Sequence, residues 1–214
     1  IMKKFIVFSL FIFLSFQMSA QGRVDYLPNF DKKSFHWGYY LGLNQLSFDY
    51  VSNDEYLPSS GTSLGFNVGL IGDFRMTDNL NFRVEPGLMT SGEKGFIEGP
   101  VWNSTYLHLP FLFKLSTNRL KNIRPFIIGG ASYDFNFKTT PDDLAHAGYE
   151  IHKNQFMTEF GIGVDIYLHY FKCSPSIRGI YSLTDELDRV GPLAVDYNYD
   201  KFRTSGVYFN LTFE

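Results

Sequence analysis

From His36 to the end of the chain, apolar and polar residues alternate in segments of about ten residues. Successive side chains of a β-strand point to opposite faces, so a period of two predicts strands with one apolar and one polar face. A strand needs about 9–11 residues to cross the hydrocarbon layer of a membrane. Eight segments show the pattern: His36–Tyr50, Ser63–Met76, Leu80–Ser91, Thr105–Ser116, Arg124–Lys138, Gln155–Leu168, Lys172–Thr184 and Lys201–Phe213. The chain is therefore predicted to be an all-β protein with eight antiparallel strands.

The first of these segments changes its apolar face part of the way along. Its early apolar positions include Leu41 and Leu43, whereas Leu46 and Phe48 have the opposite parity. One extra residue in a strand moves every following side chain to the other face. We therefore expect a β-bulge near Gln45.

Connection lengths distinguish a membrane barrel from a soluble one. Three connections are short and four are long, and the two kinds alternate along the chain. The short ones are Thr77–Asn79, Thr117–Ile123 and His169–Phe171, and the long ones are Val51–Thr62, Gly92–Ser104, Thr139–Asn154 and Asp185–Asp200. Outer-membrane barrels have short periplasmic turns and longer extracellular loops, whereas a soluble lipocalin-like barrel has no reason to keep this asymmetry. The sequence thus predicts an eight-stranded antiparallel transmembrane β-barrel of outer-membrane type, with both termini in the periplasm.

The composition agrees with a protein whose main contact is membrane lipid. Aromatic residues make up 18% of the chain and charged residues 19%, whereas soluble domains carry about 25% charge. The mean hydropathy is nevertheless slightly negative, because alternation spreads the apolar residues instead of gathering them in membrane helices. The net charge of −3 gives no basic footprint for nucleic acid. We expect membrane lipid, and not nucleic acid, as a partner.

The N-terminus has the pattern of a secretory signal peptide. Lys3 and Lys4 form a positive region, Phe5–Phe16 forms an apolar region, and Ala20 ends a small-residue cleavage site. The apolar stretch is shorter than the roughly 20 residues that a spanning helix needs. The predicted division is a signal peptide at residues 1–20, a periplasmic N-terminal segment at residues 21–35, and the barrel at residues 36–214.

The polar face of the predicted strands carries charges of both signs. Eight strands enclose a space just wide enough for side chains, so these charges would lie close together. The expected cluster consists of Asp73, Arg75, Arg83, Glu85, Lys114, Asp134, Glu159, Asp165 and Arg178. An unpaired buried charge is costly, so we expect ion pairs that plug the lumen. The alternative is a polar conduit or a proton path.

Catalytic patterns are weak in this chain. It contains no HExxH, CxxC or GxSxG motif. Of the five histidines, His36 and His169 lie near the predicted periplasmic rim, and His146 and His152 lie in one predicted external loop. A lipid-modifying enzyme would need a histidine that faces lipid. His108 lies instead on the predicted inward face. We therefore predict no catalytic residue, metal site, cofactor or small-molecule substrate.

Several stretches resemble one family of bacterial membrane barrels. Thr105–Lys114 is similar to the "YLxxPxLxK" strand of the Bacteroidetes outer-membrane β-barrel family, and Gly38–Asn44 and Arg124–Gly130 fit the same family. Within it, Leu115–Arg119 followed by Asn122–Pro125 resembles the PorT-like branch. Together these stretches span most of the chain that follows the predicted signal peptide.

The resemblance implies a function that the residues alone do not. PorT-like proteins are implicated in type IX protein secretion, so the chain is expected to be a non-enzymatic accessory of that pathway, with other secretion components as partners. It would dock partners and not conduct cargo, because a folded protein cannot pass an eight-stranded lumen. Two alternatives remain open: a small surface barrel whose external loops bind a ligand or another cell, and a lipid-modifying barrel enzyme.

The segment Gln21–Phe35 is the other candidate for contact with a partner. Its apolar residues Tyr26, Leu27, Phe30 and Phe35 stand among charges, a pattern suited to docking. The alternative is an unordered leader, which is common at the ends of domains.

Overall fold

The computed structural model describes residues 25–52, 55–57, 63–92, 94–95, 101–137, 140, 142, 149–189 and 199–214. The predicted signal peptide, residues 1–20, lies outside the described residues, as do parts of the four long connections. Within the described part of the chain, no helix is long and apolar enough to cross a membrane.

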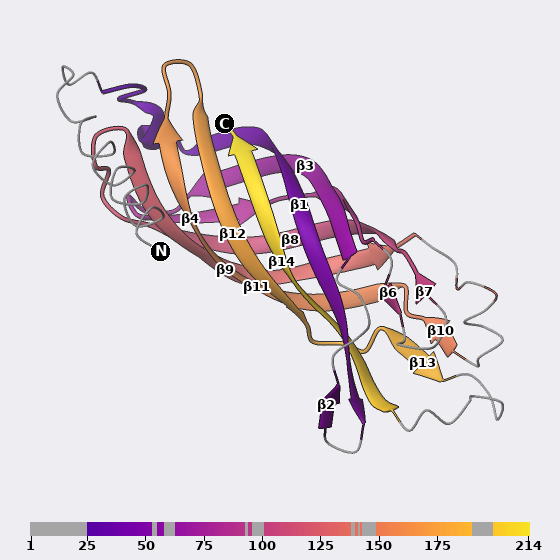
Figure 1. The fold of residues 1–214 in the computed structure, drawn as a ribbon. Helices are drawn as coiled ribbons and strands as arrows, with labels where there is room; N and C mark the ends of the chain where they lie inside the picture. The colour runs from indigo at the N-terminus through magenta and orange to yellow at the C-terminus, as the bar shows by residue number, and fades with distance from the viewer. Residues whose placement is uncertain are drawn as a thin grey trace, which may run out of the picture.

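The described chain forms one closed, twisted antiparallel sheet (Figure 1). Its wall strands are β1 (Phe35–Ser52), β3 (Ser63–Arg75), β4 (Leu80–Val84), β5 (Gly87–Thr90), β8 (Thr105–Ser116), β9 (Ile123–Asn136), β11 (Asn154–Tyr167), β12 (Lys172–Ser182) and β14 (Tyr199–Phe213). Strands β4 and β5 follow one another at a single position in the wall, between β3 and β8. Strand β1 pairs with β3 on one side and with β14 on the other, which closes the sheet. The predicted eight-stranded antiparallel barrel is confirmed.

The division between β4 and β5 comes from a proline. Pro86 has no backbone N–H to donate to the ladder, and the strand predicted at Leu80–Ser91 is interrupted there. Val84 pairs with Phe111, and Gly87 pairs with His108. The register is the same on both sides of the break, so the two pieces act as one wall strand.

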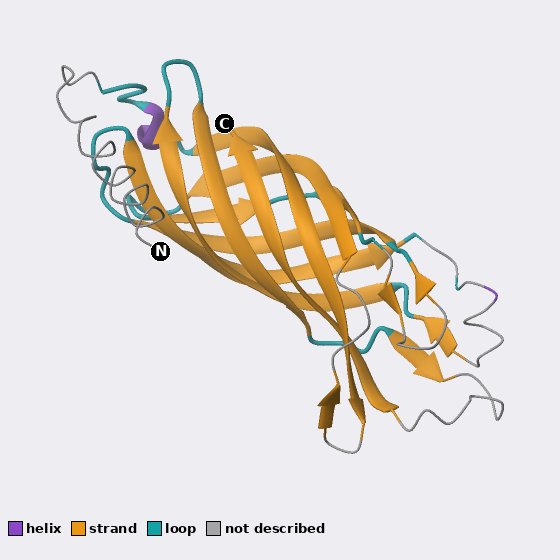
Figure 2. Ribbon diagram, viewed as in Figure 1, coloured by secondary structure: helices purple, strands orange, loops and turns teal. Residues whose placement is uncertain are grey.

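The two ends of the barrel differ (Figures 1 and 2). One end carries the short connections, the C-terminus and a 3₁₀ helix, η2 (Phe30–Lys32); we call it the turn end. The other end, the loop end, carries five short strands: β2 (Glu55–Leu57), β6 (Lys94–Gly95), β7 (Val101–Trp102), β10 (Tyr149–Ile151) and β13 (Leu187–Arg189). Strand β2 pairs with β1, β6 with β7, and β10 with β13. The short and long connections predicted from the sequence therefore lie at opposite ends.

Side chains alternate between the outer face and the interior. On β3, Leu64 and Phe66 are exposed on the outside, whereas Asn67 and Asp73 are buried. The same alternation runs through β8, β9, β11 and β12. The outer face is thus apolar and the interior largely polar, which is the reverse of a soluble barrel with an apolar core.

The predicted bulge near Gln45 is wrong. Strand β1 keeps one register with β14 from Tyr39 to Val51, and the register shifts only between Val51 and Ser52. Leu46 therefore points inward, where its side chain is fully buried. The apolar parity changes because this part of the interior is apolar, and not because the strand has gained a residue.

Candidate functional site

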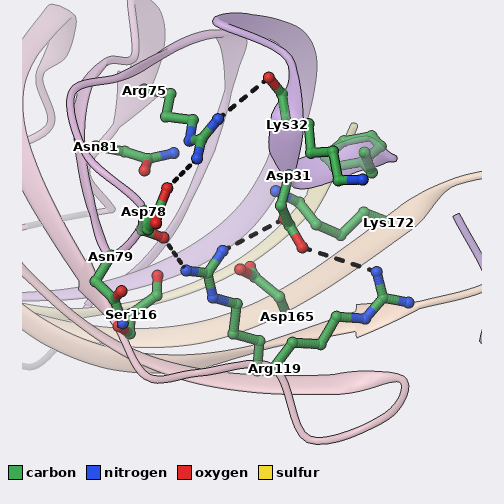
Figure 3. Close-up of polar contacts among 12 residues, drawn as sticks. Asp31, Lys32, Arg75, Asp78, Asn79, Asn81, Ser116, Arg119, Asp165 and Lys172 are labelled. Atoms are coloured by element: carbon green, nitrogen blue, oxygen red, sulfur yellow. Dashed lines mark hydrogen bonds and ion pairs between the residues drawn. The ribbon is translucent and has the colours of Figure 1, made fainter. Parts of the chain in front are cut away.

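Most of the charges expected in the lumen lie there. Eight are buried inside the barrel: Asp73, Arg83, Glu85, Lys114, Asp134, Glu159, Asp165 and Arg178. The ninth, Arg75, is the last residue of β3 and lies half-buried at the mouth of the turn end. It pairs there with Asp78, as Figure 3 shows, and makes no pair with the buried eight among the described residues.

Arg83 is the centre of the network near the turn end. The register of β3 and β4 places it opposite Asp73, and its Nε and Nη2 donate to Oδ2 of Asp73 at 2.9 and 2.5 Å. Its Nη2 also donates to Oε1 of Glu214 at 2.7 Å, and its Nη1 lies 3.4 Å from Oε1 of Glu85. One guanidinium thus contacts three carboxylates, and two of them have a second cationic partner, because Glu85 also pairs with Arg178 and Glu214 with Lys172. Buried carboxylates can be held only with such pairing.

Glu85 carries the network across the lumen. Its Oε2 lies 2.7 Å from Nη2 of Arg178 on β12. Nη1 of Arg178 lies 3.5 Å from Oε2 of Glu159 on β11. Nε2 and Nδ1 of His108 lie 3.0 Å from Glu159 and 2.6 Å from Asp134. The result is one continuous chain of alternating acidic and basic groups, in the order Asp73, Arg83, Glu85, Arg178, Glu159, His108 and Asp134.

A second buried group stands beside this chain. Nζ of Lys114 donates to both carboxylate oxygens of Asp165, at 2.7 and 2.8 Å, and Ser174 donates to the same carboxylate at 2.6 Å. Lys172 lies 2.9 Å from Oε2 of Glu214. We call the chain and these pairs together the ion-pair network.

Two members of the network were missed by the sequence-based prediction. The side chains of Glu214 and Lys172 are buried, and the Glu214 carboxylate pairs with both Lys172 and Arg83 at the turn end. Glu214 has the same parity as Asn210 and Thr212, which face inward, so this signal was available in the sequence.

Small residues make room for the side chains that fill the interior. A Cβ atom at Gly69 or Gly87 would collide with the ring of Tyr40. Because both positions are glycine, the Tyr40 ring can lie close to the inside of the wall, with its hydroxyl 3.4 Å from the backbone oxygen of Glu85. The two glycines of the wall thus leave the space inside the lumen that the Tyr40 ring occupies.

The loop end of the lumen is filled differently. Six buried side chains pack together there: Leu46, Met89, Tyr106, Met157, Ile180 and Tyr208. We call them the apolar cluster. Above it, the hydroxyl of Tyr106 donates to Oε1 of the buried Glu186 at 2.9 Å, and Thr204 donates to the other oxygen. Glu186 lies between β12 and β13, so this contact ties a loop-end segment to the interior.

The turn end is covered by residues 25–34, which we call the N-terminal cap. Backbone N–H of Tyr26 donates to Oδ1 of Asn122 at 2.9 Å, and Arg119 donates to the backbone oxygens of Tyr26 and Leu27. Phe30 stacks on the His36 ring, with the two centroids 4.2 Å apart. These contacts hold residues 25–34 on the barrel, so the alternative of an unordered leader does not fit this part of residues 21–35.

Asp31 is the central residue of the cap (Figure 3). Tyr167 donates to its Oδ1 at 2.6 Å, and its carboxylate lies 3.4 Å from Arg124 and 3.7 Å from Arg119. Arg75 reaches the backbone oxygen of Lys32 at 3.2 Å. The cap thus brings a carboxylate to two arginines, Arg119 in the turn between β8 and β9 and Arg124 at the start of β9.

The filled interior limits what the site can do chemically. Between the cap and the ion-pair network lies a cavity of about 10 Å³, lined by residues that include Asp31, Lys114 and Asp165. A cavity of roughly this size holds about one water molecule. Both ring nitrogens of His108 face carboxylates inside the wall, so this histidine is turned away from lipid. The arrangement fits a structural plug.

The other histidines are spread over the molecule. His36 is buried beneath the cap, and His169 is exposed in the turn between β11 and β12. His152 lies at the loop end, just before β11, and His146 lies outside the described residues. No group of three or more metal-binding side chains is arranged around an ion site in the described ranges.

A closed barrel of eight antiparallel strands, with an apolar outer face and a filled polar interior, defines a small outer-membrane β-barrel protein. The family comparison agrees with this class. The chain belongs to the family described as "Outer membrane protein beta-barrel domain", whose model matches residues 17–188.

Solved structures of small outer-membrane barrels are similar in fold. OprG from Pseudomonas aeruginosa is 12% identical, with 82% of this chain and 94% of that chain covered and a TM-score of 0.47. Ail, the attachment invasion locus protein of Yersinia pestis, is 11% identical, with 85% and 98% covered and a TM-score of 0.42. The outer membrane enzyme PagL is 12% identical, with 78% and 97% covered and a TM-score of 0.42. No curated protein sequence matches this chain.

Proposed function

We propose that this protein is a non-enzymatic accessory of type IX protein secretion, which acts by docking partners and not by conducting cargo. In this proposal both termini, and with them the turn end, face the periplasm, because short turns lie on that side of outer-membrane barrels. The other components of the secretion machinery are its partners.

The filled lumen is the observation that supports docking. The ion-pair network runs from the turn end of the bore to His108 and Asp134, where it meets the apolar cluster that fills the loop end. Moving a solute through it would break buried ion pairs, each of which leaves an uncompensated charge when one partner is removed. Contact with other molecules is left to the exposed surfaces at the two ends.

The buried histidine supports the absence of catalysis. A lipid-modifying enzyme in a barrel needs a base that can reach lipid, and His108 has its two nitrogens 2.6 and 3.0 Å from buried carboxylates. Its role in this proposal is to hold Asp134 and Glu159 together. The type IX assignment itself rests on the sequence resemblance at Thr105–Lys114 and Arg124–Gly130.

The test is deletion of the gene in the native organism, followed by complementation. The deletion should stop secretion of type IX cargo, which should accumulate in the periplasm while the outer membrane stays intact. Variants trimmed at Thr139–Asn154 or Asp185–Asp200, or carrying Lys32→Glu with Lys33→Glu on the exposed side of the cap, test the two ends as docking surfaces. At least one should fail to restore secretion although it inserts normally.

The matched control is a change inside the lumen that preserves folding, such as Tyr40→Phe, which should restore secretion fully. Normal secretion in the deletion strain would refute the type IX assignment. Full complementation by every surface variant would refute docking through these surfaces.

A further inference from the structure

A groove of about 800 Å³ lies on the outer wall of the barrel, towards the turn end. It crosses β9, β11 and β12, which are neighbours in the wall (Figure 1). Sites that hold small molecules typically have roughly 300–1,000 Å³. The groove is therefore large enough to hold a ligand, and not merely a gap between two side chains.

The strand register explains one side of the groove. Ile127, Ile162 and Ile177 pair across β9, β11 and β12, so they form one row along the wall. The row continues to Leu115 on β8 and to Phe209 on β14. All five side chains are exposed, so together they make a continuous apolar ridge.

The next row towards the turn end is lower. It contains Pro125, paired with Val164, and Pro175 on the following strand. A proline ring closes back onto its own backbone, and valine is one carbon shorter than isoleucine, so these side chains stand out less from the sheet. The β11–β12 ladder skips the pair of Val164 with Pro175, because Pro175 has no N–H to donate.

The floor of the groove is closed towards the lumen. Phe126 points inward and is 4% exposed. Its ring packs against Gly163, where a Cβ atom would collide with it. The groove is thus separate from the interior cavity, and it opens only to the outside of the barrel.

The groove is apolar along its length and polar at one end. Its lining at the turn end includes Asn79, Ser116 and Thr117. These residues lie in or beside the short turns, at the level where the outer face of a membrane barrel meets lipid headgroups.

We propose that the groove holds one acyl chain of a membrane lipid, whose headgroup lies at the polar turn-end rim. The groove is continuous with the apolar outer face, which is the surface that the barrel presents to the hydrocarbon layer. An acyl chain has the elongated apolar shape that the trough between two rows of side chains accepts, and the ester and headgroup region can meet the exposed side chain of Thr117. This inference rests on the fold and does not depend on the proposed role in secretion.

The test uses the purified protein in vesicles of phosphatidylethanolamine and phosphatidylglycerol. A trace of phosphatidylcholine with a diazirine on one acyl chain is added, and the labelled peptides are mapped by mass spectrometry. The groove should take up about three times more label per exposed residue than the opposite wall around Val68, since packing contacts within membranes are individually modest. Val164→Phe fills the trough and should remove this excess.

The matched control is Val68→Phe, which enlarges a lipid-facing valine outside the groove and should leave groove labelling unchanged. Heat-modifiable migration in gels checks that each variant folds. If Val164→Phe does not fold, Ile162→Ala lowers the ridge and should reduce groove labelling instead. Equal labelling of groove and opposite wall in the unmodified protein would overturn the proposal. A groove that is labelled less than the opposite wall would also overturn it, because a protein segment, such as a second copy of the chain, would then cover it.

Discussion

The two halves of the lumen are filled mainly by different means, although three buried apolar residues, Leu112, Phe126 and Ile128, also pack beside the charges towards the turn end. Towards the turn end, Arg83 and Arg178 join carboxylates from several strands into one network. Towards the loop end, Leu46, Met157 and their neighbours pack without charge. Both halves consist of inward residues of the same strands. The parity of a residue along its strand therefore determines whether its side chain faces the lumen, but not whether that side chain is charged or apolar. The two halves should therefore respond differently to substitution.

The largest effect is expected in the charged half. Arg83→Ala removes a cationic partner from Asp73, Glu85 and Glu214 at once, and breaking a buried pair costs about 3–5 kcal/mol. The measurement is the free energy of unfolding by urea in lipid vesicles. Arg75→Ala is the control, because Arg75 makes a part-exposed pair at the mouth that is worth about 0–1 kcal/mol. If the two variants lost the same free energy of unfolding, the buried pairs of Arg83 would contribute no more to stability than the part-exposed pair of Arg75 at the mouth of the turn end.

Substitution in the apolar half should cost somewhat less. Leu46→Ala leaves a cavity among Met89, Tyr106 and Tyr208, and such changes cost about 2–5 kcal/mol. Leu64→Ala is the control, because Leu64 is 76% exposed on the outer face and its removal leaves no cavity. The same urea titration measures both. If Leu64→Ala destabilised the barrel as much as Leu46→Ala, Leu46 would not face a packed interior.

The N-terminal cap offers a smaller effect. Asp31→Ala removes the acceptor for Tyr167 and the partner of Arg119 and Arg124. Because these groups are part-exposed, we expect a loss of about 1 kcal/mol, together with faster proteolytic cleavage within residues 25–34. Lys33→Ala, on the exposed side of the cap, should leave the cleavage rate unchanged. A cleavage rate that does not rise in Asp31→Ala would show that Asp31 does not hold the cap.

The smallest effect is expected when a charged pair is replaced as a whole. Lys114→Met combined with Asp165→Leu removes both charges of one pair, and replacing a buried pair by apolar residues is often neutral. Asp165→Leu alone should be much more destabilising, since it leaves Lys114 buried without its carboxylate. A double variant as unstable as the single one would mean that the site of Lys114 and Asp165 cannot adopt apolar packing like that of the loop end.

The sequence was enough to predict the wall and most of the charged half. Alternation with a period of two fixes which face each residue takes, and for Asp73, Glu159 and Arg178 the polar character of the side chain agreed with that face. Arg124 has the parity of Asp134 and could have been included in the same way. At the turn end parity alone was not enough for Arg75, because β3 stops at this residue and leaves it at the mouth.

Two features could not be predicted because hydropathy carries no signal for them. An apolar side chain can face lipid or an apolar part of the lumen, so Leu46 was assigned to the outer face and an extra residue was expected at Gln45. The cap has no strand period, and its position depends on contacts between Asp31 and arginines about 90 residues further along the chain. Such long-range pairs become visible only in the folded barrel.

The most direct test of the filled lumen is a conductance measurement on the purified protein in a planar bilayer. If the ion-pair network and the apolar cluster close the bore, the unmodified barrel should show no steady open conductance. A large, stable open channel in the unmodified protein would contradict a lumen closed by its own side chains, and with it the view that this barrel docks partners and does not conduct them.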